Sequence, residues 1–287
     1  MNFHDLVPYQ SLSDRHTMLW PDKKTLAIYF ILNVEHSTLN EGYGHTFTQQ
    51  QIASDLKNYS WREYGLRVGF WRLLKLFEHY DIPLSFLVNA DILTEYPSIT
   101  KVLQHNHILA HGKTNAEYPQ DYTHIEEKKI IQGVADTFKQ RIGYLPKGWL
   151  SPWLSIKPRT LDILHDVGFE YVLDLLMDDI PVKIQTPNKK HLWSLPYALE
   201  TNDTPTVLAR NYTSNQYYDS LISHLNACLE LSIHNSMVMA IPLHTFVAGR
   251  PQYTSCLERF IQHLVSTEIK SKVWISHPDE ILLNYNS

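Results

Sequence analysis

The chain contains 287 residues, of which 44% are hydrophobic and 19% charged, and this composition is typical of a globular protein rather than a disordered one. Its formal net charge of −5 argues against a nucleic-acid partner bound through phosphate groups. The start has no charged segment followed by an apolar core, and no apolar run approaches about 18 residues, so we expect no signal peptide, no membrane partner and a cytoplasmic location. Cys228 and Cys256 fall in or beside predicted helices, which argues against a disulfide framework.

The first strand is predicted just after a polar, turn-rich stretch, residues 1–24, which we interpret as an irregular N-terminal arm. The unbroken apolar run Leu26–Leu32 predicts a strand buried on both faces. Asn33 and Glu35 follow two residues apart and therefore lie on the same face of that strand. Polar side chains at the C-terminal end of such a strand lie where the active sites of α/β enzymes are found.

The segment 36–64 is too long for a simple connection between a strand and a helix. A lid, or a subunit contact that uses the aromatic stretch Tyr43–Trp61, is compatible with it, and so is a surface excursion with a small core of its own. The sequence does not distinguish between these alternatives.

Helices and strands alternate along the rest of the chain. Helical spacing or capping predicts helices over 68–80, 91–95, 96–105, 123–141, 157–167, 214–232 and 257–267. Short apolar runs predict strands over 84–88, 107–110, 146–153, 169–173, 192–196, 236–242 and 272–275, and the polar stretch 183–190 is expected to be a turn. This alternation favours one parallel βα barrel or a doubly wound sheet, in a single domain over residues 25–287.

Three of the predicted strands end in an ionisable side chain, namely Glu35, His111 and His244. If the strands are parallel in one closed sheet, their C-terminal ends share one mouth, so these groups meet although they are far apart in sequence. A carboxylate beside imidazoles suits acid–base catalysis or a metal that activates water. Each of these residues alone is more typical of a structural role, but their placement together at the ends of parallel strands favours a catalytic or metal-binding role. Asp174 and the loop Trp149–Trp153 end two further strands, although Asp174 also fits a helix cap.

Five segments in a fixed order carry a resemblance to a known family. They are LNVE, RVGFWRLLKLFEHYDIPLSFLV, ILAHGKTNAEY, GWLSPWLSIKPRTLDILHDVGFEYVLDLLMDDIP and MAIPLHTFVAGRP, and with LPYALETND they span roughly residues 20–285. This order resembles the polysaccharide deacetylase (NodB-homology) superfamily, most of all its cytoplasmic allantoinase-like branch. The resemblance implies an α/β fold of the distorted (β/α)7 barrel type, and it implies a homo-oligomer, a dimer or a tetramer.

The resemblance also implies roles for single residues. The family's general base and first metal ligand correspond to Asn33 and Glu35, and an amide such as Asn33 cannot accept a proton. Two metal-binding histidines four residues apart correspond to His111 and Asn115, and the family's Arg-x-Pro motif corresponds to Trp149–Pro152, without the arginine. Glu35, His111 and Asn115 would offer a metal one carboxylate, one imidazole and one neutral amide. We therefore expect no cofactor or a weakly bound divalent metal such as Zn²⁺.

The implied function is hydrolysis of a non-peptide C–N bond, by deacetylation or by cleavage of an amide, imide or ureide, in a small molecule or an N-acyl sugar. Glu35 would hold or deprotonate the water, and His111 and His244 would polarise the carbonyl and protonate the leaving nitrogen. The residues expected to bind substrate are Asn33, Asn115, Trp149, Trp153, Asp174, Tyr197 and Arg250. The aromatic members equally fit a barrel core, and Arg250 equally fits a structural or subunit ion pair. The alternative function is a catalytically inactive barrel that binds a sugar or amide ligand.

Overall fold

The strand at the centre of the sheet is β1 (Leu26–Val34), all nine residues of which are buried. The computed structural model describes residues 2–15, 18–39 and 56–286. One edge of β1 pairs along its length with β8 (Met237–His244). The other edge is shared: the start of β1 pairs with β9 (Val273–Ile275) and its end with β2 (Leu84–Val88). A strand with neighbours on both edges and apolar side chains on both faces explains the uninterrupted apolar run of the sequence.

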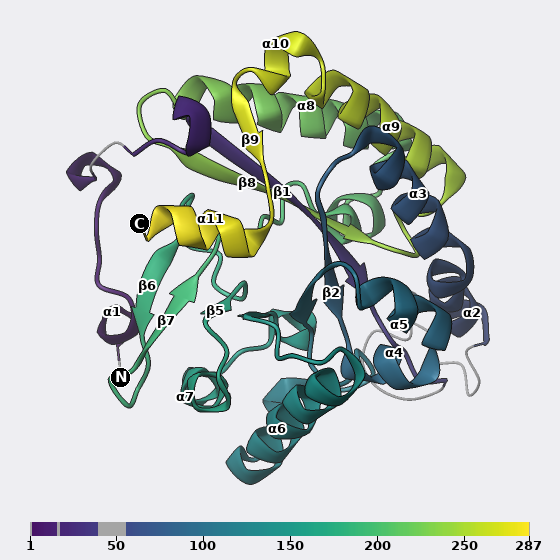
Figure 1. Cartoon of the computed structure of the whole chain (residues 1–287), viewed down its shortest axis with the longest axis vertical. Coiled ribbons are helices and arrows are strands. Elements are labelled where there is room, and N and C mark those ends of the chain that lie inside the picture. Colours follow the sequence, from purple (N-terminus) through teal and green to yellow (C-terminus); the bar gives the residue numbers. More distant parts are fainter. Residues whose placement is uncertain (1, 16–17, 40–55, 287) are drawn as a thin grey trace.

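The sheet has nine strands in the order β6-β7-β5-β4-β3-β2-β1-β8, with β9 beside β1. The strands not yet located are β3 (His107–Ala110), β4 (Gly148–Trp149), β5 (Tyr171–Val172), β6 (Val182–Gln185) and β7 (His191–Ser194). Strands β1, β2, β3, β4, β5, β7 and β8 run parallel and curl into the distorted (β/α)7 barrel that was predicted (Figure 1). Within the described residues β7 and β8 form no ladder, and β8 instead contacts the segment before β6, where the Val238 N–H donates to the Asp179 carbonyl at 2.8 Å.

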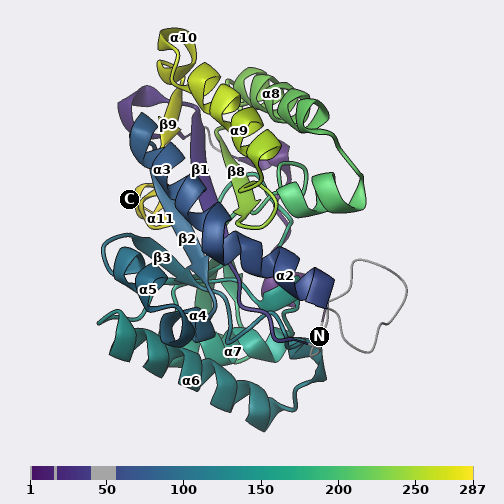
Figure 2. The ribbon, with the colours of Figure 1, turned by 90° about the vertical axis from the view of Figure 1, so that its right-hand side faces the viewer.

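Helices cover the outside of the curved sheet (Figures 1 and 2). They are α1 (Phe3–Leu6), α2 (Leu56–Tyr64), α3 (Phe70–Tyr80), α4 (Ala90–Glu95), α5 (Pro97–Leu103), α6 (His124–Arg141), α7 (Pro158–Val167), α8 (Ser214–Leu231), α9 (Pro251–Leu264), α10 (Thr267–Lys270) and α11 (Pro278–Tyr285). The predicted capping box is present: Thr123 accepts from the Glu126 amide, and the Glu126 carboxylate accepts from the Thr123 amide at 2.8 Å. Of the helices described, none has the length and apolar character needed to cross a bilayer.

Two predicted elements were wrong or incomplete, and a third element was missed. The polar stretch 183–190 is not merely a turn, because β6 and β7 form an antiparallel hairpin in which Ile184 faces Leu192 and both are buried. Strand β6 lies at the edge of the sheet, and its polar residues Lys183 and Gln185 mask the strand pattern. Helix α9 begins at Pro251, six residues before the predicted start, and α11 was not predicted.

The long segment after β1 ends in a helix rather than a loop. Helix α2 continues through the π-helical turn Gly65–Gly69 into α3, so the helical region starts at Leu56 instead of the predicted residue 68. A Cβ at Gly69 would lie 1.9 Å from the carbonyl oxygen of Thr245, so only glycine lets this helix lie directly against the loop after β8. That contact aims the C-terminal end of α2 at the mouth of the barrel. Most of the proposed contact surface Tyr43–Trp61 lies outside the described residues.

A histidine pair joins α11 to the start of the parallel strands. The rings of His107 and His277 stack with their centroids 4.6 Å apart, and the Ser85 hydroxyl lies 2.9 Å from Nδ1 of each. The hydroxyl has one proton, so it donates to one imidazole and accepts from the other. Burial and the nearby His107 lower the pKa of His277 from 6.5 to about 4, although Glu280 and Asp279 act in the opposite direction.

The depressed pKa of His277 predicts acid sensitivity. The unfolded chain binds this proton near pH 6.5 and the folded chain only near pH 4, so stability is present above pH 6.5 and falls as the pH drops toward 4. His277→Asn keeps an acceptor for Ser85 but has no titrating ring. Its melting temperature should therefore change less with pH between pH 6.5 and pH 4 than that of the wild type. The measurement is thermal unfolding of both proteins across the range. Identical slopes would show that His277 does not carry this dependence.

Candidate active site

A cavity of about 510 Å³ opens at the C-terminal ends of the parallel strands. Glu35 follows β1, His111 follows β3 and His244 ends β8, and all three side chains line this cavity. The rest of the wall is largely apolar, with Trp153 and Phe246 among its members. The parallel strands therefore bring the three predicted catalytic residues to one concave, mostly apolar site, as is usual for small-molecule pockets.

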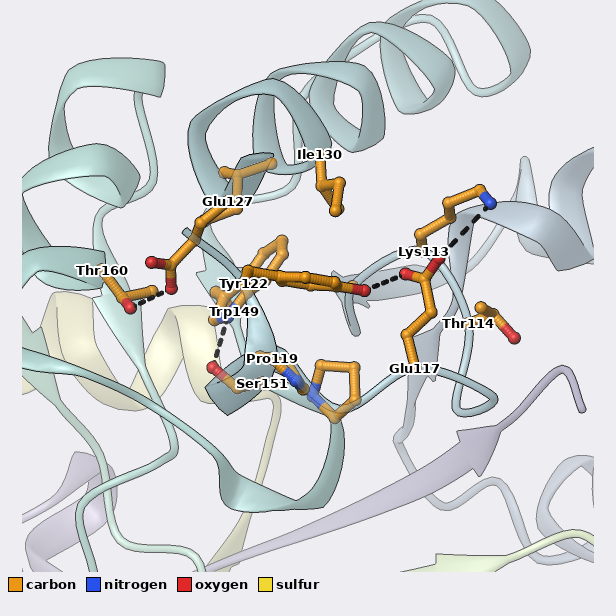
Figure 3. A pocket seen from close by; sticks show the side chains of 13 residues that line it. Lys113, Thr114, Glu117, Pro119, Tyr122, Glu127, Ile130, Trp149, Ser151 and Thr160 are labelled. Atoms are coloured by element: carbon orange, nitrogen blue, oxygen red, sulfur yellow. Dashed lines mark hydrogen bonds and ion pairs between the residues drawn. The ribbon is translucent and has the colours of Figure 1, made fainter. Parts of the chain in front are cut away.

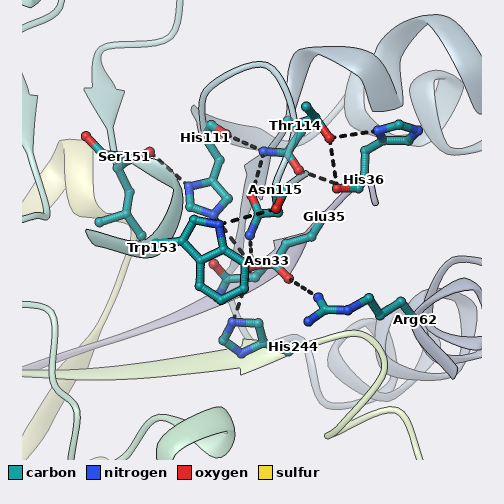
Figure 4. Close-up of polar contacts among 12 residues, drawn as sticks. Asn33, Glu35, His36, Arg62, His111, Thr114, Asn115, Ser151, Trp153 and His244 are labelled. Carbon is teal, nitrogen blue, oxygen red and sulfur yellow. Dashed lines mark hydrogen bonds and ion pairs between the residues drawn. The ribbon is translucent and has the colours of Figure 1, made fainter. Parts of the chain in front are cut away.

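One carboxylate oxygen is the point at which the three groups meet (Figure 4). Oε1 of Glu35 lies 3.6 Å from Nε2 of His111 and 3.6 Å from Nε2 of His244. The amide Nδ2 of Asn115 donates to the same oxygen at 2.6 Å. Atoms separated in this way can each lie within hydrogen-bond reach, about 2.6–3.2 Å, of one shared water. The arrangement can therefore position a water between a carboxylate and two imidazoles.

The two imidazoles differ in the group that binds Nδ1, the ring nitrogen that does not face Glu35. Nδ1 of His111 lies 2.9 Å from the carbonyl oxygen of Leu150, which can only accept, so this nitrogen carries a proton. The neutral form of His111 therefore carries its lone pair at Nε2, on the side of Glu35, and the protonated form donates from that nitrogen.

His244 is bound instead to a second carboxylate. Its Nδ1 lies 2.6 Å from Oδ1 of Asp203, a fully buried residue. The other oxygen of Asp203 accepts from the backbone N–H groups of His244 at 2.7 Å and Ala248 at 3.1 Å. Burial alone would lower the pKa of His244, but the Asp203 and Glu35 carboxylates outweigh it and raise this pKa above 6.5. His244 is thus set up as a proton donor.

Glu35 remains ionised although its side chain is buried. Burial alone would raise its pKa, but His244, His111 and Arg62 together lower it from 4.5 to about 2. Arg62, on α2, places Nη1 3.8 Å from Oε2, the oxygen that faces away from the two histidines. At neutral pH the site therefore holds a fixed carboxylate that can accept hydrogen bonds from water.

Some residues expected to bind substrate surround this centre. Asn33, Asn115, Trp153 and Tyr197 line the cavity. The Nδ2 group of Asn33 donates to the Leu243 carbonyl at 3.0 Å and to the Tyr197 hydroxyl at 3.2 Å, so it holds the floor of the site together.

Three others lie outside the cavity lining, contrary to their predicted place. Trp149 lines a separate small cavity beside Tyr122, where its indole donates to Ser151 at 3.0 Å (Figure 3). Arg250 lies with its guanidinium 3.7 Å from the centre of the Tyr64 ring, a cation–π contact. Asp174 accepts from the Ser151 amide at 3.0 Å, and burial raises its pKa to about 7.

Comparisons with known proteins agree with this geometry. No protein-family model matches the sequence. A Schizosaccharomyces pombe protein with the provisional name polysaccharide deacetylase is 25% identical and aligns with 91% of this chain and 90% of its own. The peptidoglycan deacetylase of Helicobacter pylori is 26% identical over 69% of this chain and 78% of its own. The crystal structure of Puue allantoinase superposes with a TM-score of 0.86 at 25% identity, covering 98% of this chain and 96% of its own.

The chain resembles the polysaccharide deacetylase (NodB-homology) superfamily in sequence and in fold. The likeness to an allantoinase extends over nearly the whole length of both chains, in agreement with the resemblance to the allantoinase-like branch. Position by position, this chain carries Asn33 where the resemblance places a base and Asn115 where it places a second histidine ligand.

The side chains present do not fit the metal ion that this superfamily implies. The Asn89 carbonyl oxygen accepts from the His36 backbone N–H at 2.8 Å, so the Asn89 Nδ2 group must donate, at 3.0 Å, to Oδ1 of Asn115. This fixes Asn115 with its NH₂ toward Glu35, and an NH₂ group cannot ligate a cation. In the described parts of the chain no group of three or more His, Cys, Asp or Glu is placed to hold a metal. The predicted set Glu35, His111 and Asn115 is therefore a hydrogen-bonded cluster.

Sequence reasoning missed two residues of this site, Asp203 and Arg62. Asp203 closes the polar run at residues 200–203, directly before the π-helical segment Thr204–Ala209, and nothing in the sequence indicated that it would reach the end of β8. Arg62 falls in the segment 36–64, for which no helix was predicted. The superfamily resemblance does not single out either residue.

Proposed function

We propose that this protein hydrolyses a non-peptide C–N bond in a small molecule by adding water to an amide-type carbonyl at the barrel mouth. The class of reaction follows from the family, since the relatives are named as deacetylases and an allantoinase. The substrates to consider are linear and cyclic amides, ureides and N-acyl sugars. The cavity volume of about 510 Å³ is of the size that suits molecules of this kind.

The observation that carries the proposal is the position of Glu35 Oε1, 3.6 Å from Nε2 of both His111 and His244. With a pKa of about 2, Glu35 is a weak proton acceptor at neutral pH, and its role is to hold the water. His111, with a lone pair at Nε2, accepts the proton that the attacking water loses. His244, kept protonated by Asp203, gives a proton to the leaving nitrogen. One imidazole faces a backbone carbonyl and the other faces a carboxylate. Such a difference in surroundings is a common basis for assigning one group as the acid and the other as the base.

We further propose that the reaction needs no resident metal, because Asn115 turns its NH₂ group toward Glu35. The family resemblance and the composition also lead us to propose a cytoplasmic homo-oligomer, a dimer or tetramer, of one barrel domain over residues 25–287. The arm 1–24 is tied to this domain by Arg15, which donates to Asp178 at 2.7 and 2.5 Å.

The test is a panel of amides, ureides and N-acyl sugars incubated with purified protein, with EDTA in one series and added Zn²⁺ in another. We expect release of amine or ammonia from at least one substrate, at the same rate in both series. Turnover that EDTA removes and Zn²⁺ restores would contradict only the proposal that the reaction needs no metal, and the proposed hydrolysis would stand. Saturable binding of a panel member without turnover in either series would leave the inactive binding barrel as the function.

A further inference from the structure

One buried carboxyl beside the site has no part in the acid–base roles. Asp174 follows β5, is only 6% exposed and lies outside the lining of the catalytic cavity. Burial opposes its ionisation and raises its pKa to about 7. Aspartates buried to this extent are uncommon, and carboxyls with a strongly shifted pKa gather at functional sites. The contacts of Asp174 therefore need an explanation.

Asp174 is connected to His111 through a single peptide group. The Leu150 carbonyl oxygen accepts from Nδ1 of His111 at 2.9 Å, beside Ser151 in Figure 4. The N–H at the other end of that peptide group belongs to Ser151, and it donates to Oδ1 of Asp174 at 3.0 Å. The peptide group is trans and planar, so its C=O and N–H point in opposite directions. The imidazole and the carboxyl group thus bind opposite ends of one rigid unit.

Three neighbouring strands of the sheet hold the members of this series. His111 follows β3, the peptide group follows β4 and Asp174 follows β5, and these strands are parallel and adjacent. The Leu150 N–H donates to the Ala110 carbonyl at 3.0 Å, so the sheet fixes the chain up to Leu150. The next peptide group lies beyond the strand, and Asp174 holds it by its N–H.

Each imidazole of the site is thus linked to a buried carboxyl group, but in a different way. Asp203 binds Nδ1 of His244 directly at 2.6 Å, which favours the imidazolium. Asp174 reaches His111 only through a neutral carbonyl group, which accepts the Nδ1 proton. Hydrogen bonds in series polarise one another, so an ionised acceptor at the N–H strengthens the carbonyl at the other end.

We propose that Asp174 is a positioning residue that holds His111 in its Nδ1-protonated form, and in its orientation toward Glu35, through the peptide group between Leu150 and Ser151. This inference rests on the proposed function, in which His111 accepts the proton of the attacking water at Nε2. If the peptide group rotated, Nδ1 would lose its acceptor. The ring proton would then also occupy Nε2, and a neutral ring in that form cannot take a proton from the water at that atom.

The first readout needs no substrate. ¹⁵N NMR of histidine-labelled protein at about pH 8, above the pKa of Asp174, reports which ring nitrogen of His111 carries the proton. We expect Nδ1 in the wild type and a mixture of both forms in Asp174→Leu, which removes the acceptor. Asp174→Asn keeps an oxygen for the Ser151 N–H and should stay closer to the wild type. The His111 signals are assigned by their loss in His111→Gln.

The second readout is the rate on the panel substrate with the highest turnover. Asp174→Leu should lower kcat by roughly 10- to 100-fold, the range typical of losing a partner that orients a functional imidazole, while KM changes only a few-fold. Asp174→Asn should fall between that variant and the wild type. The control is Asp162→Asn. Asp162 is a buried aspartate that accepts from the Asn188 N–H at 3.0 Å outside the catalytic cavity, so its change should leave kcat and the His111 signals unaltered.

Three results would overturn the assignment. An unchanged His111 spectrum in a folded Asp174→Leu protein would show that other contacts hold the ring. Asp174→Asn as slow as Asp174→Leu, with the proton still at Nδ1, would mean that the charge acts without the peptide group. A raised KM with unchanged kcat would place Asp174 in substrate binding.

Two further controls keep these outcomes apart. Asp174→Ala also removes the acceptor and takes the place of Asp174→Leu if circular dichroism shows that the leucine variant does not fold. Wild-type protein without turnover on the panel overturns the proposed function, and the NMR comparison then still decides whether Asp174 holds His111. An active wild type with an unmoved His111 proton confines the failure to Asp174.

Discussion

Glu35→Gln is expected to lower kcat/KM by roughly 10²- to 10⁴-fold, the range typical of losing a group that manages the attacking water. The amide keeps the size of the side chain and an oxygen for the Asn115 donor, but it has no charge with which to hold water between His111 and His244. Initial rates on the substrate found by the panel give the comparison. Wild-type rates in this variant would remove Glu35 from the mechanism.

Glu95→Gln is the matched control for this experiment. Its carboxylate lies 3.5 Å from His36 outside the catalytic cavity, so its loss should leave the rate unchanged. A second readout comes from stability. Because the pKa of Glu35 is lowered from 4.5 to about 2, its contribution is present above pH 4.5 and is lost as the pH falls toward 2. Glu35→Gln should therefore unfold with a shallower pH dependence in that window.

The parts of the fold that the sequence predicts are those where local signals and burial agree. Strand β1 is apolar on both faces because alternate residues pack into two hydrophobic cores, with Ile28 and Phe30 in one and Tyr29 and Ile31 in the other, and its sequence is accordingly an unbroken apolar run. Helix α6 carries its capping box, and α7 ends at Gly168 in the left-handed region at φ 111°. In each case a few adjacent residues determine the element, so no knowledge of the tertiary structure is needed.

The elements that escaped prediction depend on distant partners. The hairpin β6–β7 has an edge strand whose polar side chains hide its pairing, and only contact with β5 completes it. The helical region from Leu56 contains Gly65 and Gly69, which weaken a helix as local signals but are required by the contact with Thr245. These two glycines are required by a tertiary contact, although they lower the helix propensity of the segment that contains them.

The same division applies to the site. Glu35, His111 and His244 are predictable because parallel strands share one mouth, so a polar residue at each strand end is a candidate. Asp203 precedes the π-helical segment Thr204–Ala209 and Arg62 lies on α2, and no strand pattern specifies where these two segments lie relative to the mouth. The strand pattern therefore predicts the positions of the reacting groups. The charged residues that shift the pKa values of Glu35 and His244 come from segments that only the folded structure locates.

Asp203→Asn is expected to lower kcat by roughly 10²- to 10⁴-fold, through His244 rather than by contact with substrate. The asparagine oxygen can still accept from the backbone N–H groups of His244 and Ala248, and its NH₂ group then faces Nδ1 of His244. An NH₂ group cannot accept the Nδ1 proton, so His244 loses the partner that keeps it protonated. Asp203 is in this sense a positioning residue.

The pH profile separates this role from a purely structural one. Because Asp203 and Glu35 raise the pKa of His244 against the effect of burial, the wild-type rate should fall as the pH rises through that elevated value. In Asp203→Asn the fall should begin at lower pH, since only Glu35 still favours the imidazolium. A variant with a reduced rate but an unmoved basic limb would mean that Asp203 only holds the loop in place. Asp203→Glu, which restores the charge, should move the limb back toward the wild type even if the rate recovers only in part.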